Sequence, residues 1–375
     1  MREQSPNTEC EIILRETKNC DNSANVVRNV VFSYMKPGTL KDVAQQLNLS
    51  ISTVSRVVNR KGYVKKETRQ RVLSCLEACN YVPNEIARSL KVQASMTIGV
   101  IVPDICEVFL SRIIKGIDRT VSGAGYMLIV ADSNESKQME RRYLDIMFQK
   151  RVDALVVATV DLKGPKVERF ISHNIPVLFI DNLPQLKDTE ANYIIVDNRK
   201  ASQMAVQTLL DNGHRRIAVI AGSTEETTGC ERLGGYTDML RERGIPVDPS
   251  LIVCGNYKTD DGYRCMDQLL RQRELHPFTA IYVTSEMMTI GALRAIREHH
   301  LTVGKDLAVI GFDVHDDLGL ATPKIATIRQ PEVEIGIQSG KLLLQLLDPK
   351  RYGAPQRTQI FMQAYFEPGS SNNKI

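Results

Sequence analysis

The 375-residue sequence lacks any apolar run that approaches the roughly 18 to 20 residues of a membrane-spanning helix. Its first residues, MREQSPNTECEIILRE, also lack the basic segment followed by an apolar stretch that marks an exported protein. We therefore expect a soluble cytoplasmic protein without a membrane partner. With 43% hydrophobic and 25% charged residues, the chain has enough apolar side chains for two or three globular units.

Short motifs that would indicate catalysis are missing as well. The chain contains no G-x-x-x-x-G-K-[ST], G-x-G-x-x-G, G-x-S-x-G or H-E-x-x-H. Its eight cysteines include no C-x-x-C, and no close Cys/His cluster offers a zinc site. Cys75 and Cys79, four residues apart, fit a buried helix face in a reducing compartment. We predict no enzymatic activity, no cofactor and no bound metal.

The positive charge, in contrast, is concentrated in one short region. Residues 35–91 hold eleven Lys and Arg against four Asp and Glu, whereas residues 92–375 hold thirty-three against thirty-five. A solvated charged face does not explain this concentration. A small basic unit on a nearly neutral large one indicates a phosphate-binding head attached to a body with another task.

The basic region has the pattern of a helix-turn-helix. Thr39 can cap a first helix with Asp42 in a capping-box arrangement, and Ser50 can cap a second helix after a turn at Asn48. The inward side chains of these helices and of a third helix at about 66–79 are Leu40, Val43, Ala44, Leu47, Val54, Val57, Val58, Val72, Cys75, Leu76 and Cys79. Three short helices around this small core form a minimal folded head.

In such a head the second helix enters the major groove of DNA. Arg56 can pair with guanine O6 and N7, Ile51 can meet a thymine methyl, and Ser52 can donate or accept. The side chains better placed for phosphates are Thr39, Thr53, Ser55 and Asn59. Each residue alone also fits a helix cap or a solvated surface position, but together with the charge distribution they favour DNA binding.

Three runs of sequence resemble a known family. T-L-K-D-V-A, then S-x-x-T-V-S-R-V-V-N, then T-R-x-R-V followed by Y-V-P-N-x-x-A-R-S-L-K match the headpiece of the LacI/GalR family of bacterial repressors over residues 36–91 without a gap. The resemblance implies that Ile51, Ser52 and Arg56 touch bases. It also implies that residues 83–90 form a hinge that becomes helical only on DNA, with Leu90 wedged into the minor groove.

The hinge segment has chemistry that fits this role. Pro83 can begin a helix, and the residues that follow are too few to be a stable helix alone. In a homodimer on a pseudo-palindromic double-stranded operator, two Leu90 side chains can unstack one central base step, with Arg88 and Lys91 as nearby cations. The alternative is that Ala87 and Leu90 belong to an ordinary packed helix.

Residues beyond about 95 alternate between apolar runs and helix-length segments. The apolar runs are TIGVIV, YMLIVA, ALVVA, VLFI, YIIV, RIAVIAG, AIYV and LAVIGF. This alternation predicts an α/β fold of parallel sheets with helices on both faces. The length favours two lobes with a break near 196–198, and a ligand pocket at the carboxyl ends of the strands between them.

The resemblance continues through P-D-I, V-D-N, G-H-R-R-I-A-V-I-A-G, R-L-G-G-Y and V-I-G-F-D. It implies a two-lobed fold like that of periplasmic sugar-binding proteins, with three chain crossings. The expected divisions are an extension that is disordered or not translated (1–34), a helix-turn-helix domain (35–82), a hinge and linker (83–94) and an effector domain (95–375), with lobe one at 95–196 and 326–352 and lobe two at 197–325 and 353–375.

Effector contacts are expected at strand ends and loops. Arg232 matches a ligand-binding arginine of the family, Asp313 can accept from sugar hydroxyls, and Tyr257 can stack on a ring. The full candidate set is Phe109, Ser133, Asn182, Arg232, Tyr257, Glu286 and Asp313. The family patterns change at Glu107-Val108, Asn182, Ser285-Glu286 and Val314, so a standard hexose is not assured. The family favours a sugar, sugar acid or sugar phosphate.

The sequence thus predicts a DNA-binding transcriptional repressor whose operator affinity is controlled by a small metabolite. Two alternatives remain at this point. A periplasmic-type sugar-binding protein would share the lobes but needs a signal peptide and has no use for a basic head. A sugar-modifying enzyme with a DNA-binding head would need catalytic groups that the motifs do not supply.

Overall fold

The computed structural model describes residues 39–59, 62–79, 81, 94–164, 166–184, 191–316, 319, 322–353 and 358–373. The chain divides into two compact units between Val92 and Gln93, and each unit is described by itself. The predictions for the extension (1–34) and for the hinge residues Ala87, Arg88, Leu90 and Lys91 lie outside the described residues.

The smaller unit contains the three predicted helices, α3 (Leu40–Leu47), α4 (Ile51–Val58) and α5 (Lys66–Ala78). The Thr39 hydroxyl accepts from the backbone N–H of Asp42 at 3.3 Å, and the Asp42 carboxylate accepts from the backbone N–H of Thr39 at 2.8 Å. This capping box confirms the predicted start of the first helix, because it satisfies donors that have no partner inside the helix.

The turn and the core of this unit also follow the sequence pattern. Asn48 takes a left-handed conformation with φ of 51°, and Ser50 then accepts from the backbone N–H of Thr53 at 3.2 Å. The buried side chains that join the helices are Val43, Ala44, Val54, Val57, Val72, Cys75 and Leu76. The helix-turn-helix prediction is therefore confirmed at the level of the fold.

Two six-stranded sheets form the larger unit within the described residues. The first has the order β11-β5-β4-β3-β1-β2 and is parallel throughout. Its strands are β1 (Thr97–Val102), β2 (Met127–Asp132), β3 (Ala154–Val157), β4 (Val177–Ile180), β5 (Asn192–Val196) and β11 (Gln359–Met362). The buried apolar runs predicted to be strands form its centre.

The second sheet repeats this order as β12-β10-β9-β8-β6-β7, with β12 antiparallel to β10. Its strands are β6 (Ile217–Ala221), β7 (Ile252–Cys254), β8 (Ala280–Val283), β9 (Ala308–Phe312), β10 (Ala326–Arg329) and β12 (Tyr365–Glu367). In each sheet the chain winds first toward one edge and then toward the other, so both sheets have a topological switch point at the same place. Ligands of open α/β folds bind at such switch points.

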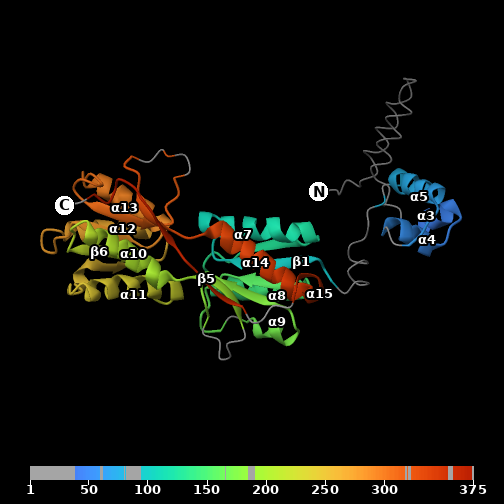
Figure 1. The fold of residues 1–375 in the computed structure, drawn as a ribbon, viewed down its shortest axis with the longest axis horizontal. Coiled ribbons are helices and arrows are strands. Elements are labelled where there is room, and N and C mark those ends of the chain that lie inside the picture. The colour runs from blue at the N-terminus through green and yellow to red at the C-terminus, as the bar shows by residue number, and fades with distance from the viewer. Residues whose placement is uncertain are drawn as a thin grey trace, which may run out of the picture. The chain divides into compact units, whose positions relative to one another are not determined.

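Helices cover both faces of each sheet (Figure 1). In lobe one, α7 (Val108–Val121) and α14 (Glu332–Leu347) cover one face, and α8 (Lys137–Gln149) and α9 (Glu168–Ser172) cover the other. In lobe two, the pairs are α10 (Asn198–Asp211) with α11 (Thr227–Glu242), and α12 (Thr259–Arg271) with α13 (Glu286–Glu298). The described residues also form the short helices η2 (Ser122–Ala124), η3 (Pro249–Leu251) and α15 (Pro349–Tyr352).

Two helices far apart in sequence, α7 and α14, lie side by side on lobe one (Figure 1). Gly116 and Gly336 form their closest approach, because a Cβ atom added at Gly336 would lie 2.3 Å from the carbonyl oxygen of Ile113. Any side chain at this position would force the helices apart. The glycine pair therefore fixes α14 tightly to α7.

The expected lobe boundaries near the C-terminus are wrong. Residues 326–329 were assigned to lobe one, but β10 pairs with β9 in the second sheet. Residues beyond 353 were assigned to lobe two, but β11 pairs with β5 in the first sheet. The chain therefore crosses between the lobes after β5, after β10 and after β11, which keeps the predicted three crossings but moves two of them. No helix of the described residues is long and apolar enough to cross a membrane.

Candidate functional site

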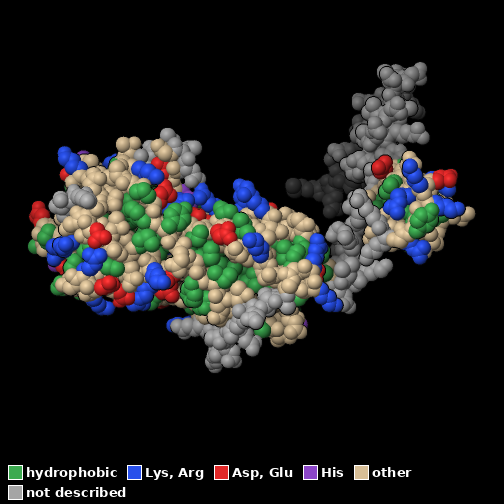
Figure 2. Space-filling view, viewed as in Figure 1, with side chains coloured by type: hydrophobic (Ala, Val, Ile, Leu, Met, Phe, Trp, Pro, Cys, Tyr) green, Lys and Arg blue, Asp and Glu red, His purple; other side chains and the backbone are tan. Residues whose placement is uncertain are grey.

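The exposed side of α4 carries the three predicted base-contacting residues. Ile51 is 51% exposed, and Ser52 and Arg56 are also exposed, whereas Val54 and Val57 are buried in the core of the head. Lys and Arg side chains lie on the visible face of this unit (Figure 2). The exposed arginine, serine and isoleucine of α4 have the chemistry of a DNA-reading surface.

Thr39, Thr53 and Asn59 lie at helix ends and Ser55 lies within α4, and each of these four predicted phosphate contacts already has an intramolecular partner. The hydroxyls of Ser50 and Thr53 are 2.8 Å apart, and the Asn59 amide donates to the backbone oxygen of Ser55 at 2.8 Å. Thr39 donates its hydroxyl proton to Asp42 at 2.7 Å. Of these four residues, Thr39 therefore acts as a helix cap. A phosphate contact there remains a prediction.

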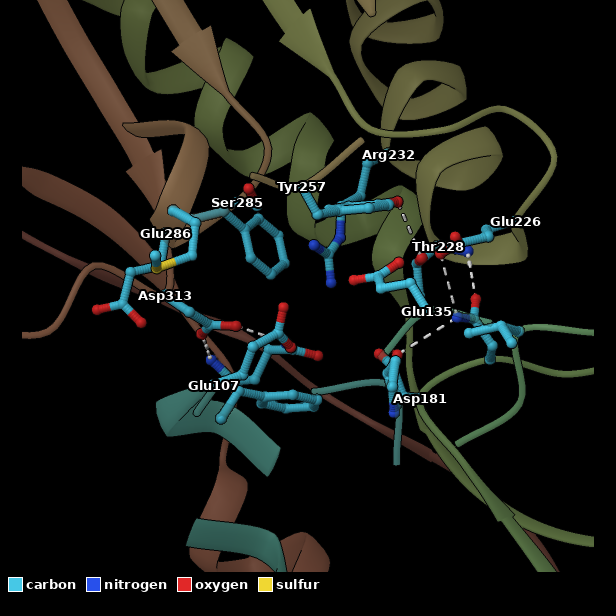
Figure 3. A pocket seen from close by; sticks show the side chains of 17 residues that line it. Glu107, Glu135, Asp181, Glu226, Thr228, Arg232, Tyr257, Ser285, Glu286 and Asp313 are labelled. Carbon is cyan, nitrogen blue, oxygen red and sulfur yellow. Dashed lines mark hydrogen bonds between the residues drawn. The ribbon is translucent and has the colours of Figure 1, made fainter. Parts of the chain in front are cut away.

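In the larger unit, a cavity lies between the lobes (Figure 3). Its walls come from the carboxyl ends of strands in both sheets. The lining residues are Pro103, Glu107, Phe109, Glu135, Val160, Asp181, Asn182, Glu226, Thr228, Arg232, Tyr257, Ser285, Glu286, Met287, Phe312, Asp313 and Gln330. Its position at the carboxyl ends of the strands is where open α/β folds bind small molecules.

Four of the lining residues adopt left-handed backbone conformations. Their φ angles are 59° at Glu135, 62° at Asp181, 61° at Tyr257 and 54° at Asp313. Each residue follows the end of a different strand, and none is a glycine. Such conformations cost roughly 1 kcal/mol or more per residue. Their concentration around one cavity indicates that the side chains are held in place for a ligand.

Arg232, on α11, is only 5% exposed and is held at three points. Its Nε–H donates to Asn198 at 2.7 Å, one Nη1–H donates to the backbone oxygen of Thr284 at 2.8 Å, and the guanidinium lies 3.7 Å from the ring centre of Phe312. Figure 3 shows the guanidinium directed into the cavity. The Nη2 group has no hydrogen-bond partner in the described part of the chain, so it is free to bind a ligand.

Asp313 and Tyr257 are also placed by neighbouring residues. The backbone and side-chain N–H groups of Gln330 donate to the two oxygens of Asp313 at 2.9 and 2.6 Å. Burial raises the pKa of Asp313 to about 6. The Tyr257 hydroxyl lies 3.2 Å from that of Thr228, and the tyrosine ring packs against Gly222. Each polar group keeps a free hydrogen-bonding direction for a ligand.

Asn182, on the loop after β4, connects the two lobes. Its carbonyl oxygen accepts from the Thr227 hydroxyl at 2.9 Å and from the backbone N–H of Thr228 at 3.2 Å. Its amide donates to Glu226 at 3.4 Å. A residue of lobe one thus caps the N-terminus of α11 in lobe two, where no side chain of the helix's own preceding residue does so.

An ion-pair bridge crosses the same cleft. Lys258 of lobe two lies 3.3 Å from Asp104 and 3.3 Å from Glu135, both of lobe one. Together with Asn182, these contacts hold the lobes against each other in the described conformation. Lys258 and Asp104 do not line the cavity themselves, so this bridge is a contact between lobes at its edge.

Several carboxyl groups of the cavity have raised pKa values. Burial and the neighbouring carboxylates raise the pKa of Glu107 to about 8 and that of Glu226 to about 7. Burial also raises the pKa of Asp181, although Arg232 opposes the shift. Desolvation disfavours the charged form, and like charges nearby add to it. The cavity is therefore short of positive charge.

Behind the cavity wall, His315 bridges two carboxylates. Its Nδ1–H donates to Glu286 at 3.0 Å and its Nε2–H donates to Glu332 at 2.9 Å, so both ring nitrogens carry protons. Burial disfavours the imidazolium, but these two hydrogen bonds outweigh burial and raise the pKa of His315 to about 9. Glu332 begins α14, so the bridge joins a cavity residue of lobe two to a helix of lobe one.

Six of the seven predicted effector residues meet at the cavity. These are Phe109, Asn182, Arg232, Tyr257, Glu286 and Asp313. Ser133 is the exception and requires a correction: it is fully buried, and its hydroxyl donates to the backbone oxygen of Val102 at 3.2 Å. Its position after β2 suggested a lining residue, but the side chain turns inward and ties two strand ends together.

Sequence reasoning missed other lining residues, among them Glu135, Asp181, Glu226, Thr228 and Gln330. The sequence contains only part of the information needed to predict them. Each follows a strand or opens a helix, which places it at the correct edge, but nothing local shows that five loops converge. Among the described residues, no cluster of His, Cys, Asp and Glu could hold a metal ion.

Comparisons with known families agree with this architecture. Residues 39–84 match the family of bacterial regulatory proteins named after LacI. Residues 95–367 match the family of periplasmic binding proteins and sugar binding domain of the LacI family. The two matches cover the helical unit and the two-lobed unit respectively.

Individual relatives cover most of the chain. The transcriptional repressor CytR of Escherichia coli K12 is 35% identical over 322 residues, 85% of this chain and 92% of its own. The transcriptional repressor PurR of Histophilus somni is 32% identical over 314 residues, 83% of this chain and 93% of its own. A crystal structure of the lac repressor dimer bound to operator and the anti-inducer ONPF aligns with a TM-score of 0.79 at 27% identity, covering 90% of this chain and all of that one.

Proposed function

Because the chain belongs to the LacI family of bacterial regulatory proteins and is therefore a DNA-binding transcriptional regulator, we propose that a small molecule in the interlobe cavity sets its affinity for an operator. One observation carries this proposal. Polar side chains from both lobes meet around one cavity, and four of the residues that carry them hold left-handed backbone conformations there. A ligand bound at this place contacts both lobes at once.

The DNA-reading role rests on the exposed side of α4. We assign base contacts to Ile51, Ser52 and Arg56, and phosphate contacts to Thr39, Thr53, Ser55 and Asn59. A homodimer would present two such helices to the half-sites of a pseudo-palindromic operator. The lac repressor dimer bound to operator, with its similar fold, supports this arrangement. The minor-groove role of Ala87, Arg88, Leu90 and Lys91 completes the proposal.

Ligand binding would act through the relation between the lobes. A ligand changes operator affinity only if it binds one arrangement of the lobes more tightly than the other. The bridge from Glu286 through His315 to Glu332 supports a route for this coupling, because it joins the cavity wall to α14. Hydrophobic side chains gather around α14 on the face seen in Figure 2. We assign the dimer contact of lobe one to this face.

The ligand contacts proposed here come from both sides of the cavity. Arg232 and Asp313 supply a donor and an acceptor for polar groups, and the Tyr257 and Phe109 rings supply apolar surface. The protein would act by binding rather than by catalysis, and in the cytoplasm, where its DNA is. Relatives that are named as transcriptional repressors support this reading.

The experiment that tests the proposal has two stages. Duplexes selected from a random pool by the full-length protein give the operator, and thermal-shift screening of small polar metabolites gives the ligands. We expect symmetric selected sites and a change of about tenfold or more in operator Kd when a ligand is added, which corresponds to about 1.4 kcal/mol of coupling. Ligands that stabilise the protein but leave operator Kd unchanged would refute the coupling.

A further inference from the structure

The lining of the cavity is strongly acidic. Six of its residues carry carboxyl groups, namely Glu107, Glu135, Asp181, Glu226, Glu286 and Asp313, and Arg232 is the single Lys or Arg among the lining residues. Figure 3 shows the labelled carboxyl groups arranged around the cavity below Arg232. A site for an anionic ligand would show the opposite balance of charge.

Three of these carboxyl groups are satisfied by other residues of the protein. Glu135 pairs with Lys258 at 3.3 Å, and Glu286 accepts from His315 at 3.0 Å. Asp313 accepts from Gln330 through both oxygens. These groups are held in place without a ligand, so they do not require a cation in the cavity.

The other three have no cation in salt-bridge contact within the described part of the chain. Asp181 and Glu226 share the weakly placed amide of Asn182, at 3.4 Å from each. Among the described residues, the carboxyl group of Glu107 makes no hydrogen bond or ion pair, although Glu107 stands at the N-terminus of α7 and does not cap that helix. Ionising half-buried acids in this state carries a desolvation cost that a bound cation would offset.

Arg232 gives an independent indication that a ligand belongs here. The residue is only 5% exposed, and its Nη2 group faces the cavity without a hydrogen-bond partner among the described residues. A ligand therefore needs an oxygen acceptor near Arg232 as well as a donor for the three acids. Hydroxyl groups meet the first need, and an ammonium group meets the second.

We infer that the cavity binds an amino sugar or a similar hydroxylated amine, with its ammonium group among Glu107, Asp181 and Glu226 and a hydroxyl oxygen on Arg232. This inference rests on the proposed function and narrows its ligand class. It predicts weaker binding of sugar acids and sugar phosphates, which the family resemblance leaves open. Their anionic groups would lie close to the three acids in a space shielded from water.

Proton release should accompany binding. With the pKa of Glu107 raised to about 8 and that of Glu226 to about 7, the empty cavity keeps protons on these groups near neutral pH. An ammonium ion favours their ionised forms and expels the protons. The charged and titratable groups that face them are Asp104, Glu135, Asp181, Arg232, Tyr257 and Lys258. Affinity for the amine should therefore rise between pH 6 and pH 8.

The test compares matched sugars on the full-length protein by isothermal titration calorimetry. Glucosamine, galactosamine and mannosamine are each paired with the neutral parent hexose, and glucuronate and glucose 6-phosphate serve as anions. At least one amino sugar should bind about tenfold or more tightly than its parent. The inference is overturned if a parent hexose or an anion binds as tightly as the best amino sugar, or if no amino sugar binds at about 10 mM.

Variants then locate the ammonium group. Glu107→Gln and Glu226→Gln should each reduce the ratio of amino-sugar to hexose affinity by about tenfold, while Glu225→Gln, at an exposed neighbouring position, should leave the ratio unchanged. An unchanged ratio in both cavity variants would also overturn the inference. If an anionic or neutral ligand binds and alters operator affinity, this inference fails while the proposed function stands; if no ligand alters operator affinity, the proposed function itself fails.

Discussion

Asn182 of lobe one accepts a hydrogen bond from the backbone N–H of Thr228, at 3.2 Å, in the first turn of a helix of lobe two. A helix N-terminus normally takes its cap from the residue just before it. Here the cap comes from the opposite side of the cavity. The start of α11 is therefore fully capped only when the lobes are close together, which links helix stability to lobe closure.

Removing this cap should loosen the lobes without unfolding either one. We expect Asn182→Ala to increase hydrogen exchange at Thr228 and to weaken ligand binding by about fivefold, because a missing cap costs roughly 1 kcal/mol. Asn256→Ala changes an exposed asparagine outside the cavity lining and is the matched control. Equal exchange at Thr228 in the wild type and in Asn182→Ala would contradict the interlobe cap.

Arg232 should prove essential to both stability and ligand response. Arg232→Met leaves Asn198 and the Thr284 carbonyl without their buried donor, so we expect a loss of about 2 to 4 kcal/mol in the free energy of unfolding. Arg232→Lys keeps the charge but cannot reproduce the fork of donors, and should rescue neither stability nor ligand binding. Denaturant unfolding and calorimetry measure the two effects. Full rescue by lysine would show that only the charge matters.

The Glu286–His315–Glu332 bridge predicts a pH effect of defined sign. The pKa of His315 in the folded protein, about 9, lies above its value of roughly 6.5 in an unfolded chain. Its stabilisation is therefore complete below pH 6.5 and is lost as the pH rises through 9.

The stability difference between the wild type and His315→Leu should accordingly shrink by on the order of 2 kcal/mol between pH 6 and pH 10. Urea unfolding across this range measures it, with His276→Leu as a control outside the bridge. A difference that stays constant with pH would mean that His315 does not carry the charge assigned to it.

The glycine contact between α7 and α14 predicts a packing defect. Gly336→Ala places a methyl group 2.3 Å from the Ile113 carbonyl oxygen, so we expect a loss of about 1 to 3 kcal/mol. Gly123→Ala adds a methyl group where no atom lies within 4 Å and should change stability little. Thermal unfolding of the two variants gives the comparison, and equal midpoints would show that the helices separate without cost.

Arg56 on α4 predicts a change in base preference. Arg56→Ala should cost about 1 to 3 kcal/mol on the selected operator and relax the preference at one position in each half-site. Thr53→Ala, at a proposed phosphate contact, should instead weaken binding to all duplexes alike. Competition with operators altered at single positions separates the two outcomes. Uniform weakening by Arg56→Ala would make Arg56 a phosphate contact.

The head was predictable from sequence because its signals are local. Thr39 and Ser50 are good caps, and a cap makes its hydrogen bond to a residue three positions along the chain. The strands of the lobes were predictable for a similar reason, since a buried parallel strand reads as a short apolar run. Neither kind of signal depends on what the rest of the chain does.

The lobe assignment of β10 and β11 was not predictable in this way. Both are four-residue runs, and which sheet they join depends on pairing with distant strands. The acids at Glu107, Asp181 and Glu226 share this limit, because each lies on its own loop and their convergence follows only from the folded arrangement. Ser133 was wrongly predicted to line the cavity for the opposite reason. It does follow a strand end, but its side chain turns inward.

The most direct test measures operator affinity with and without a cavity ligand in the wild type and in Arg232→Lys. Fluorescence anisotropy on a selected operator duplex gives both dissociation constants for each protein. The account predicts a ligand-dependent change of about tenfold or more in the wild type and none in the variant, with similar operator affinity for both proteins when no ligand is present. A ligand effect of equal size in Arg232→Lys would contradict the assignment of this cavity as the regulatory site.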